Sequence, residues 1–336
     1  MKPQLSFGYL YDFRNPAQWQ RPWSELYAET LDVIAWTESA GFTGAWVPEH
    51  HGAEDGYIPS PLAVLGAIAA RTKTIRIGSA IAQAPLYHPV RFAEDSAVLD
   101  ILADGRLELA LAIGYRRRET AAFGVDFTKR GSLFDEFLHI VRGLWGGETV
   151  TFAGKHFNVD KATLRPLSPR GQIPLYIGGF AEKALARVAK YADGYFGDEN
   201  LSDLYTAKLR EQGRDPASAR IRIPGLFFTV AHDPEQAMHE LAPYYHHVNN
   251  TYGQWMNEDK ALGLDDAALK PMDLDAFKRS GILHILTPDA AVAKFKAMQA
   301  RMPVEHFMMM KPSGLPAERF IHYADIFAKE VVPALA

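Results

Sequence analysis

Short apolar runs alternate with longer amphipathic stretches along most of the chain. The runs have the length of β-strands, whereas the longer stretches repeat their apolar residues with the helical period of about 3.6. The predicted strands are Leu5–Leu10, Thr43–Pro48, Ile75–Ile81, Leu107–Ile113, Leu175–Ile177, Gly194–Phe196, Ile221–Val230 and His306–Met310. Strands that alternate with helices predict βαβ units and a parallel sheet.

Proline and small polar residues mark the starts of several predicted helices. Ser60-Pro61 and Thr287-Pro288 each combine an N-cap residue with a proline at the first helical position, and Pro89 opens another helix. Ser132 is expected to cap a helix over Leu133–Trp145.

Eight β/α units favour a closed TIM (β/α)8 barrel. An open, doubly wound sheet should carry a G-x-G-x-x-G turn after an early strand, and no such turn follows Leu5–Leu10 or Thr43–Pro48. The alternation breaks at about residues 235–280, which predicts an insertion before the last strand, near the C-terminal mouth of the barrel. We expect residues 1–336 to form a single barrel domain that carries this insertion.

Composition narrows the chemistry. The 336 residues include no cysteine, which excludes disulfides, thiol nucleophiles and cysteine-bound metals, so any redox work requires a bound cofactor. The formal net charge of −4 comes without basic runs, so neither nucleic acid nor a membrane surface is an expected partner. No run of about 18 apolar residues occurs, and we expect a cytoplasmic protein.

The segment Trp46–His51 ends the second predicted strand, where barrel enzymes place catalytic residues. His50 can exchange a proton near neutral pH, and a neighbouring carboxylate can orient its ring. The alternatives are a structural histidine and a metal ligand. We expect no metal, because neighbouring residues on a strand point to opposite faces.

Three other strand ends have features of a cofactor site. Ser79, Ala80 and Ile81 are small or apolar residues that a flat ring could approach, and Gly114-Tyr115 offers a sharp exit and a covering ring. Gly178-Gly179, before a predicted helix at Glu182, could bind phosphate through free N–H groups. Each segment alone is equally compatible with an ordinary packed turn.

In order and spacing, these motifs resemble the bacterial luciferase-like flavin-dependent monooxygenases. The resemblance covers nearly the whole chain except the insertion. It rests on Glu49-His50-His51, Thr72–Gly78, His88–Asp95, Gly105-Arg106-Leu107, Gly114-Tyr115-Arg116, Ile177-Gly178-Gly179 and Thr287-Pro288-Asp289. True luciferase α chains carry a cysteine near the flavin, so neither light emission nor a long-chain aldehyde substrate is implied here.

The resemblance implies a two-component enzyme that binds reduced FMN at the barrel mouth. A separate NAD(P)H:flavin reductase would supply the FMN, and a C4a-(hydro)peroxyflavin would oxygenate a small organic substrate with O2. On the same basis F420-dependent hydride transfer is the alternative, and a non-catalytic flavin-binding protein is a further one. We also expect a homodimer.

The resemblance also assigns roles to residues. It gives the catalytic role to His50 and implies a cis peptide bond at Ala80-Ile81. The cofactor would lie against Ser79, Ala80, Ile81, Gly114, Tyr115, Gly178, Gly179 and Phe180. Loop position alone places four residues in the substrate pocket: Tyr57, Tyr244, Tyr245 and Trp255.

Overall fold

Eight parallel strands close into a barrel in the computed structural model, which describes residues 4–258 and 269–335. Around the barrel the strand order is β1-β12-β9-β8-β7-β4-β3-β2. The bounds are β1 Ser6–Tyr11, β2 Gly44–Val47, β3 Arg76–Gln83, β4 Leu107–Ala112, β7 Leu175–Gly178, β8 Gly194–Phe196, β9 Ile221–Pro224 and β12 Val304–Lys311. The predicted TIM barrel is therefore confirmed.

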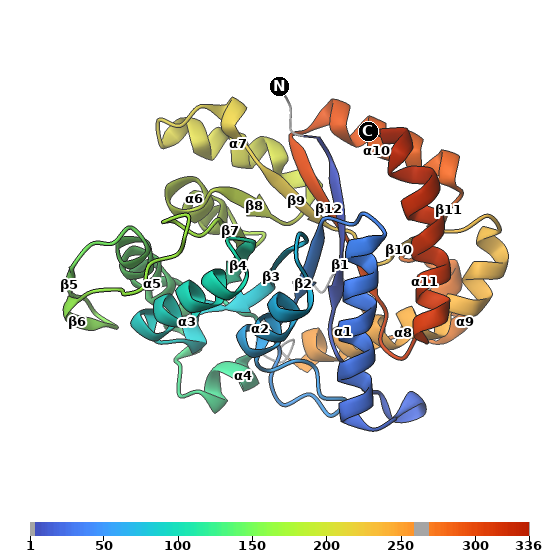
Figure 1. Ribbon diagram of the computed structural model, residues 1–336, viewed down its shortest axis with the longest axis horizontal. Coiled ribbons are helices and arrows are strands. Elements are labelled where there is room, and N and C mark those ends of the chain that lie inside the picture. Colours follow the sequence, from blue (N-terminus) through green and yellow to red (C-terminus); the bar gives the residue numbers. More distant parts are fainter. Residues whose placement is uncertain (1–3, 259–268, 336) are drawn as a thin grey trace.

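Helices surround this barrel (Figure 1). They are α1 Trp23–Ser39, α2 Pro61–Arg71, α3 Pro89–Leu102, α4 Arg117–Ala122, α5 Arg130–Trp145, α6 Glu182–Tyr191, α7 Ser202–Glu211, α8 Pro234–Glu258, α9 Leu274–Arg279, α10 Pro288–Arg301 and α11 Ala317–Ile326. None of the helices within the described ranges is both long enough and apolar enough to cross a bilayer.

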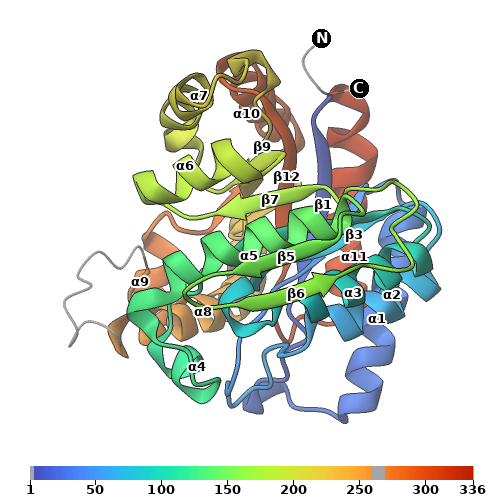
Figure 2. The same cartoon turned by 90° about the vertical axis from the view of Figure 1, so that its left-hand side faces the viewer.

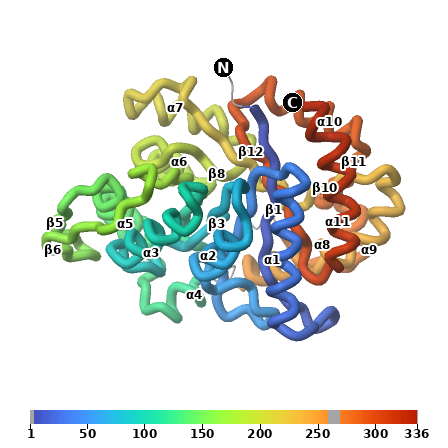
Figure 3. Tube along the Cα trace, viewed as in Figure 1, coloured from blue at the N-terminus to red at the C-terminus, as the bar shows by residue number. Residues whose placement is uncertain are grey.

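The first and last strands close the barrel. β1 and β12 pair in parallel along six residues, from Ser6 opposite His306 to Tyr11 opposite Lys311. Figure 3 shows the two ends of the chain, blue and red, side by side for this reason. Within the barrel, a Cβ on Gly44 would lie 2.6 Å from the indole nitrogen of Trp46, so glycine leaves the space that this side chain fills.

Two small sheets lie outside the barrel. β5 (Val150–Ala153) and β6 (Asn158–Ala162) form an antiparallel hairpin, which Figure 2 shows over α5. β10 (Phe228–Val230) pairs with β11 (His284–Leu286).

The single predicted strand Ile221–Val230 is wrong, because it divides into β9 and β10. Pro224 has no N–H to continue a ladder, and a Cβ on Gly225 would lie 1.9 Å from the ring of Phe307, so the chain turns away from the barrel here. The expected insertion follows and contains α8 and α9, with residues 259–268 outside the described part.

A buried ion network holds the N-terminal end of the barrel. Arg222 is 2% exposed and contacts Glu108 at 2.5 Å and Glu305 at 2.9 Å. Its guanidinium lies 3.5 Å from the centre of the Tyr176 ring, and the Tyr176 hydroxyl donates to Glu305. Since these charges come from β4, β9 and β12, they tie strands from different parts of the barrel.

Arg222→Ala should destabilise the protein strongly, because it leaves two buried carboxylates without their common cation. We expect a loss of about 3–5 kcal/mol in the free energy of unfolding, measured by urea denaturation. Arg301→Ala removes an exposed pair with Glu199 and should cost less than about 1 kcal/mol. Equal losses in the two variants would contradict a stabilising role for the buried network.

Candidate active site

His50 lies in the loop after β2, at the carboxyl end of the barrel strands. Its backbone N–H donates to the carbonyl of Ile58 at 3.1 Å, which fixes the loop, and the residue is 7% exposed. The sequence prediction therefore placed this histidine at the correct end of the barrel.

Glu119, on α4, collects four hydrogen-bond donors around its buried carboxylate. His50 Nδ1 lies at 2.9 Å, the His51 N–H at 3.0 Å, Gln83 Nε2 at 2.7 Å and Arg116 Nη1 at 2.9 Å. Burial by itself would raise the pKa of Glu119, but the hydrogen bonds from His50, His51 and Gln83 lower it to about 2. Glu119 is therefore ionised at neutral pH and acts only as an acceptor.

This carboxylate fixes the tautomer of His50. Nδ1 must carry the proton that it donates to Glu119, which leaves Nε2 as the proton acceptor of the neutral ring. Burial lowers the pKa of His50 more than Glu119 raises it, and the positive charges of Arg116 and Arg14 lower it further. The imidazole is thus a neutral base at neutral pH.

A second carboxylate supports the same loop. Glu49 accepts from the backbone N–H of Gln83 at 2.6 Å, from the hydroxyl of Tyr87 at 2.6 Å and from His51 Nε2 at 3.1 Å. Because Gln83 binds both Glu49 and Glu119, the end of β3 is fastened to the loop that carries His50.

Four aromatic rings surround the His50 imidazole. The ring centres of Tyr57 and Trp255 both lie 4.7 Å away, Tyr115 lies at 5.5 Å and Tyr252 at 5.9 Å. The hydroxyls of Tyr57 and Tyr252 are 2.6 Å apart. This wall makes a largely apolar surrounding for the base.

Tyr252 was not predicted. It lies three residues before Trp255 on α8 and therefore on the same helical face. This spacing in the sequence was the signal that could have identified it.

Two guanidinium groups lie behind the aromatic wall. Arg116 Cζ is 4.1 Å from the ring centre of Trp255, and Arg14 Cζ is 5.0 Å from that of Tyr57. Arg14 is fully buried and pairs with Asp55 at 2.6 Å. Sequence reasoning missed Glu119, Arg14 and Asp55, since no motif marks them.

The middle of β3 contributes the predicted segment Ser79–Ile81. The Ala80-Ile81 peptide bond is cis, as the resemblance implied. The Ser79 hydroxyl donates to the carbonyl of Ala110 at 2.8 Å and is fully buried, so the side chain of Ile81 is the more accessible surface. A Cβ on Gly178 would lie 2.3 Å from Ile81 Cδ1, so this segment meets the end of β7.

The predicted phosphate turn follows β7. Gly179 has a φ of +144°, Phe180 is 74% exposed, and α6 begins at Glu182 without a side-chain cap. Its first N–H groups are therefore at the end of the strand, as a phosphate site would require.

Gly114 and Tyr115 lie between β4 and α4. Gly114 has a φ of +71°, and a Cβ there would lie 2.2 Å from Gln83 Oε1, so only glycine suits this exit. The Tyr115 hydroxyl is buried and has no hydrogen-bond partner within residues 4–258 and 269–335. Buried hydroxyls are normally paired, so this one is available to a polar atom of a bound molecule.

The structure does not bring Tyr244 and Tyr245 to His50. Tyr244 packs on Trp19, with ring centres 4.5 Å apart, and Tyr245 is buried against Phe227. The substrate role predicted for these two tyrosines therefore has no support from contacts with the base, whereas Tyr57 and Trp255 touch it.

A buried histidine at the carboxyl mouth of a TIM barrel is the arrangement typical of TIM-barrel enzymes. Comparison with known proteins identifies the family. The family described as luciferase-like monooxygenase matches residues 5–305. The chain belongs to this family, whose members are oxidoreductases.

F420-dependent and flavin-dependent relatives both match most of the chain. An F420-dependent glucose-6-phosphate dehydrogenase of Beutenbergia cavernae is 32% identical over 328 residues, 90% of this chain and 93% of that protein. The oxygenase component of a flavin-dependent trigonelline monooxygenase from Acinetobacter baylyi is 23% identical over 343 residues, covering 94% and 92%. Four other curated relatives align over only 49% to 65% of their own length.

The fold is shared with solved structures. The monooxygenase RslO1 from Streptomyces bottropensis superposes with a TM-score of 0.81 at 20% identity, covering 98% of this chain and 100% of that one.

Glu119→Gln should reduce stability in a pH-dependent way. The pKa of Glu119 falls from 4.5 to about 2 on folding, so the ionised carboxylate stabilises the fold above pH 4.5, and this stabilisation is lost as the pH falls toward 2. At pH 7 we expect a loss of about 3 kcal/mol in the free energy of unfolding.

Urea denaturation at pH 7, 4 and 3 measures this difference, which should shrink at the lower pH values. Glu94→Gln, at an exposed carboxylate, is the control and should show no such trend. A constant deficit of Glu119→Gln from pH 7 to pH 3 would contradict the ionised state of this group.

Proposed function

We propose that the protein is the oxygenase of a two-component, FMN-dependent monooxygenase that acts on a small organic substrate. The observation that carries this proposal is the neutral His50 imidazole, held by Glu119 inside an aromatic wall. A separate NAD(P)H:flavin reductase would supply reduced FMN, as the name "oxygenase component" of the Acinetobacter relative suggests.

The residues present fit a flavin. Gly178 lies against the side chain of Ile81, which follows Ala80, and the buried Tyr115 hydroxyl lacks a polar partner among the described residues. These residues, with Gly114 and Ser79 behind them, would hold the ring. The turn Gly178, Gly179 and Phe180 would hold the phosphate at the start of α6. Reduced FMN would supply the electrons and the activation of O2.

The protein's own part is to position a proton acceptor and exclude water. Glu119 holds the His50 ring so that Nε2 remains free to take a proton from substrate or cofactor. The rings of Tyr57, Tyr115, Tyr252 and Trp255 limit solvent at this nitrogen, which protects reactive species from water.

F420-dependent hydride transfer is the second candidate. The full-length match to the Beutenbergia F420-dependent enzyme, at 32% identity, favours it. A neutral base beside the cofactor serves this reaction too, because oxidation of an alcohol also releases a proton. The homodimer and the non-catalytic flavin-binding protein stay predictions.

A cofactor titration separates these functions. The purified protein is titrated with FMN and with F420 while absorption and fluorescence are recorded, and O2 consumption is then measured with each reduced cofactor. We expect binding of FMN and O2 uptake with reduced FMN. Binding of F420 without O2 uptake would overturn the monooxygenase proposal, and flavin binding without turnover on any substrate would favour the non-catalytic protein.

His50→Ala should lower turnover by roughly 10²–10⁴-fold, because a positioned general base contributes a factor of that size. Cofactor affinity should be largely retained, since the predicted cofactor segments lie on β3 and in the turns after β4 and β7, although Tyr115 among them lies beside the His50 ring. His232→Ala, on the surface beside Glu330, is the matched control and should retain full turnover. Undiminished turnover in His50→Ala would refute the catalytic role.

A further inference from the structure

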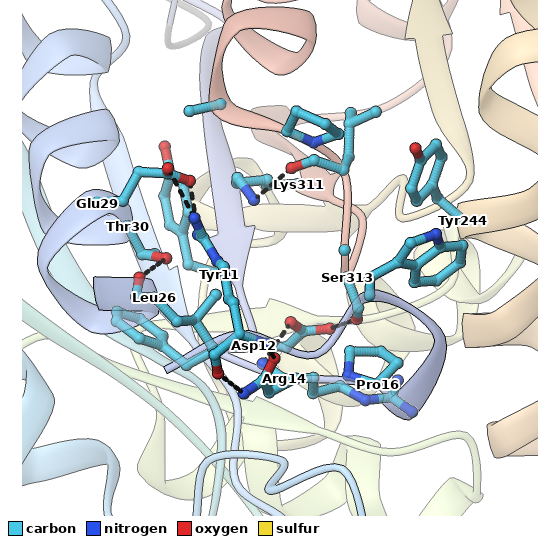
Figure 4. Close-up of a pocket in the computed structure, with 18 of the residues that line it drawn as sticks. Tyr11, Asp12, Arg14, Pro16, Leu26, Glu29, Thr30, Tyr244, Lys311 and Ser313 are labelled. Carbon is cyan, nitrogen blue, oxygen red and sulfur yellow. Dashed lines mark hydrogen bonds and ion pairs between the residues drawn. The ribbon is translucent and has the colours of Figure 1, made fainter. Parts of the chain in front are cut away.

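A cavity of about 660 Å³ lies outside the barrel wall, between the ends of β1 and β12 and the helices α1 and α11 (Figure 4). Tyr11 and Lys311 are opposite each other in these paired strands, so their side chains point the same way. The Tyr11 hydroxyl bonds to Thr37 on α1, which shows that this direction is outward. The preceding residues, Leu10 and Met310, contribute instead to the apolar cluster inside the barrel.

The ammonium group of Lys311 lines this cavity without a counter-ion in contact. Lys311 is 7% exposed, and its Nζ donates to the carbonyl of Leu315 at 3.1 Å. Within the described residues it forms no ion pair. An ammonium has three protons to donate, so this buried cation can donate a hydrogen bond to a further acceptor.

The nearby carboxylates are already engaged by other groups. Glu29 is held by Arg21 through two contacts of 2.8 and 2.6 Å. Asp12 accepts from the Ser313 hydroxyl at 2.7 Å and from the Arg14 N–H at 3.2 Å. Both carboxylates lie close enough to favour the charge of Lys311, but neither supplies the direct partner that a buried ammonium lacks.

The start of α11 presents its first backbone N–H groups at the cavity, and Glu318 in the same turn also lines it. This helix of 10 residues begins at Ala317 after Pro316, which provides no side-chain cap, and both residues line the cavity. The first N–H groups of a helix favour an anion. Lys311 and the helix start are independent observations that favour the same ligand charge.

The opposite side of the cavity is aromatic and apolar. The rings of Trp19 and Tyr244 pack at 4.5 Å with an angle of 31°, and Leu26 and Pro16 also line it. A ligand that matches both sides has a carboxylate at one end and an apolar or aromatic body at the other.

We propose that this cavity is a binding site for a small organic carboxylate, with its carboxylate on Lys311 and its apolar body against Trp19 and Tyr244. The site is distinct from the His50 site and does not depend on the proposed function. It also gives a role to Tyr244, which does not reach the base.

The pH dependence of binding tests the role of Lys311 in the unmodified protein. Burial lowers the pKa of Lys311 to about 8. The charged groups around it are Asp12, Glu29, Arg21 and, at the start of α11, Glu318. Burial raises the pKa of Asp12, the hydrogen bond from Arg21 lowers the pKa of Glu29, and the same contact raises the pKa of Arg21. An anion should therefore bind to the charged amine at pH 7 and lose affinity at pH 9.5.

Isothermal titration of the purified chain with benzoate, without cofactor, measures this affinity. We expect saturable binding at pH 7 that weakens roughly tenfold at pH 9.5, as the amine loses its proton. No binding at pH 7, or equal affinity at both pH values, would overturn the proposal. Inorganic phosphate should bind more weakly than benzoate, and equal affinity would overturn the role of the aromatic side.

Three variants at pH 7 locate the site. Lys311→Met keeps the length of the side chain without its charge and should abolish benzoate binding. Lys329→Met, at an exposed lysine paired with Asp325, should bind like the unmodified protein. Undiminished binding by Lys311→Met would contradict the site, and should this variant not fold, the pH comparison decides. His50→Ala should bind benzoate normally. A loss of binding in this variant would instead place the ligand at the barrel mouth.

Discussion

The carboxylate of Glu119 is the contact on which the candidate active site depends. It joins the loop after β2, the end of β3 and the loop after β4 through hydrogen bonds to His50, Gln83 and Arg116. A buried carboxylate is costly unless its oxygens are satisfied, and here donors from three separate strand ends satisfy it. Displacement of any of these segments would remove a donor from a buried charge, so their relative positions are strongly constrained.

The aromatic wall depends on the same arrangement. Trp255 comes from α8, far along the chain, and contacts both the His50 ring and the guanidinium of Arg116, which also binds Glu119. On the other side Arg14 holds Asp55 and stacks on Tyr57. The insertion is therefore joined to the barrel mouth by ring and cation contacts together with hydrogen bonds such as those between Tyr252 and Tyr57 and from Arg14 to Thr251.

The sequence predicted the barrel well because its signals are local. Apolar runs and prolines identify individual strands and helix starts, and α2, α3 and α10 begin at Pro61, Pro89 and Pro288 as expected. Ser132 failed as a cap because α5 begins at Arg130, two residues earlier, and the hydroxyl bonds back to Lys129 instead. The strand Ile221–Val230 failed because its apolar content continues past the turn at Pro224-Gly225.

The site was predicted only in part. The resemblance marked His50, and loop position selected Tyr57 and Trp255, which do contact its ring. Glu119 reaches His50 across 69 residues, and no spacing rule connects the two. Tyr244 and Tyr245 were chosen by loop position, although adjacent residues on a helix point about 100° apart and cannot both face one pocket. Long-range pairings of this kind require the three-dimensional arrangement.

Glu119 and Lys311, two buried charges at the carboxyl end of the barrel, differ in the number of their hydrogen-bond partners. Glu119 accepts from four donors, so its charge is fully used in holding the loops and is not available to a ligand. Lys311 donates to one carbonyl beside a cavity, so most of its hydrogen-bonding capacity is unused. An acceptor on a ligand in the proposed site would use this remaining capacity. Arg14 stands between the two charges, since its N–H binds Asp12 at the cavity and its guanidinium stacks on Tyr57 beside His50. A ligand at Lys311 would therefore act on the same residue that supports the wall around the base.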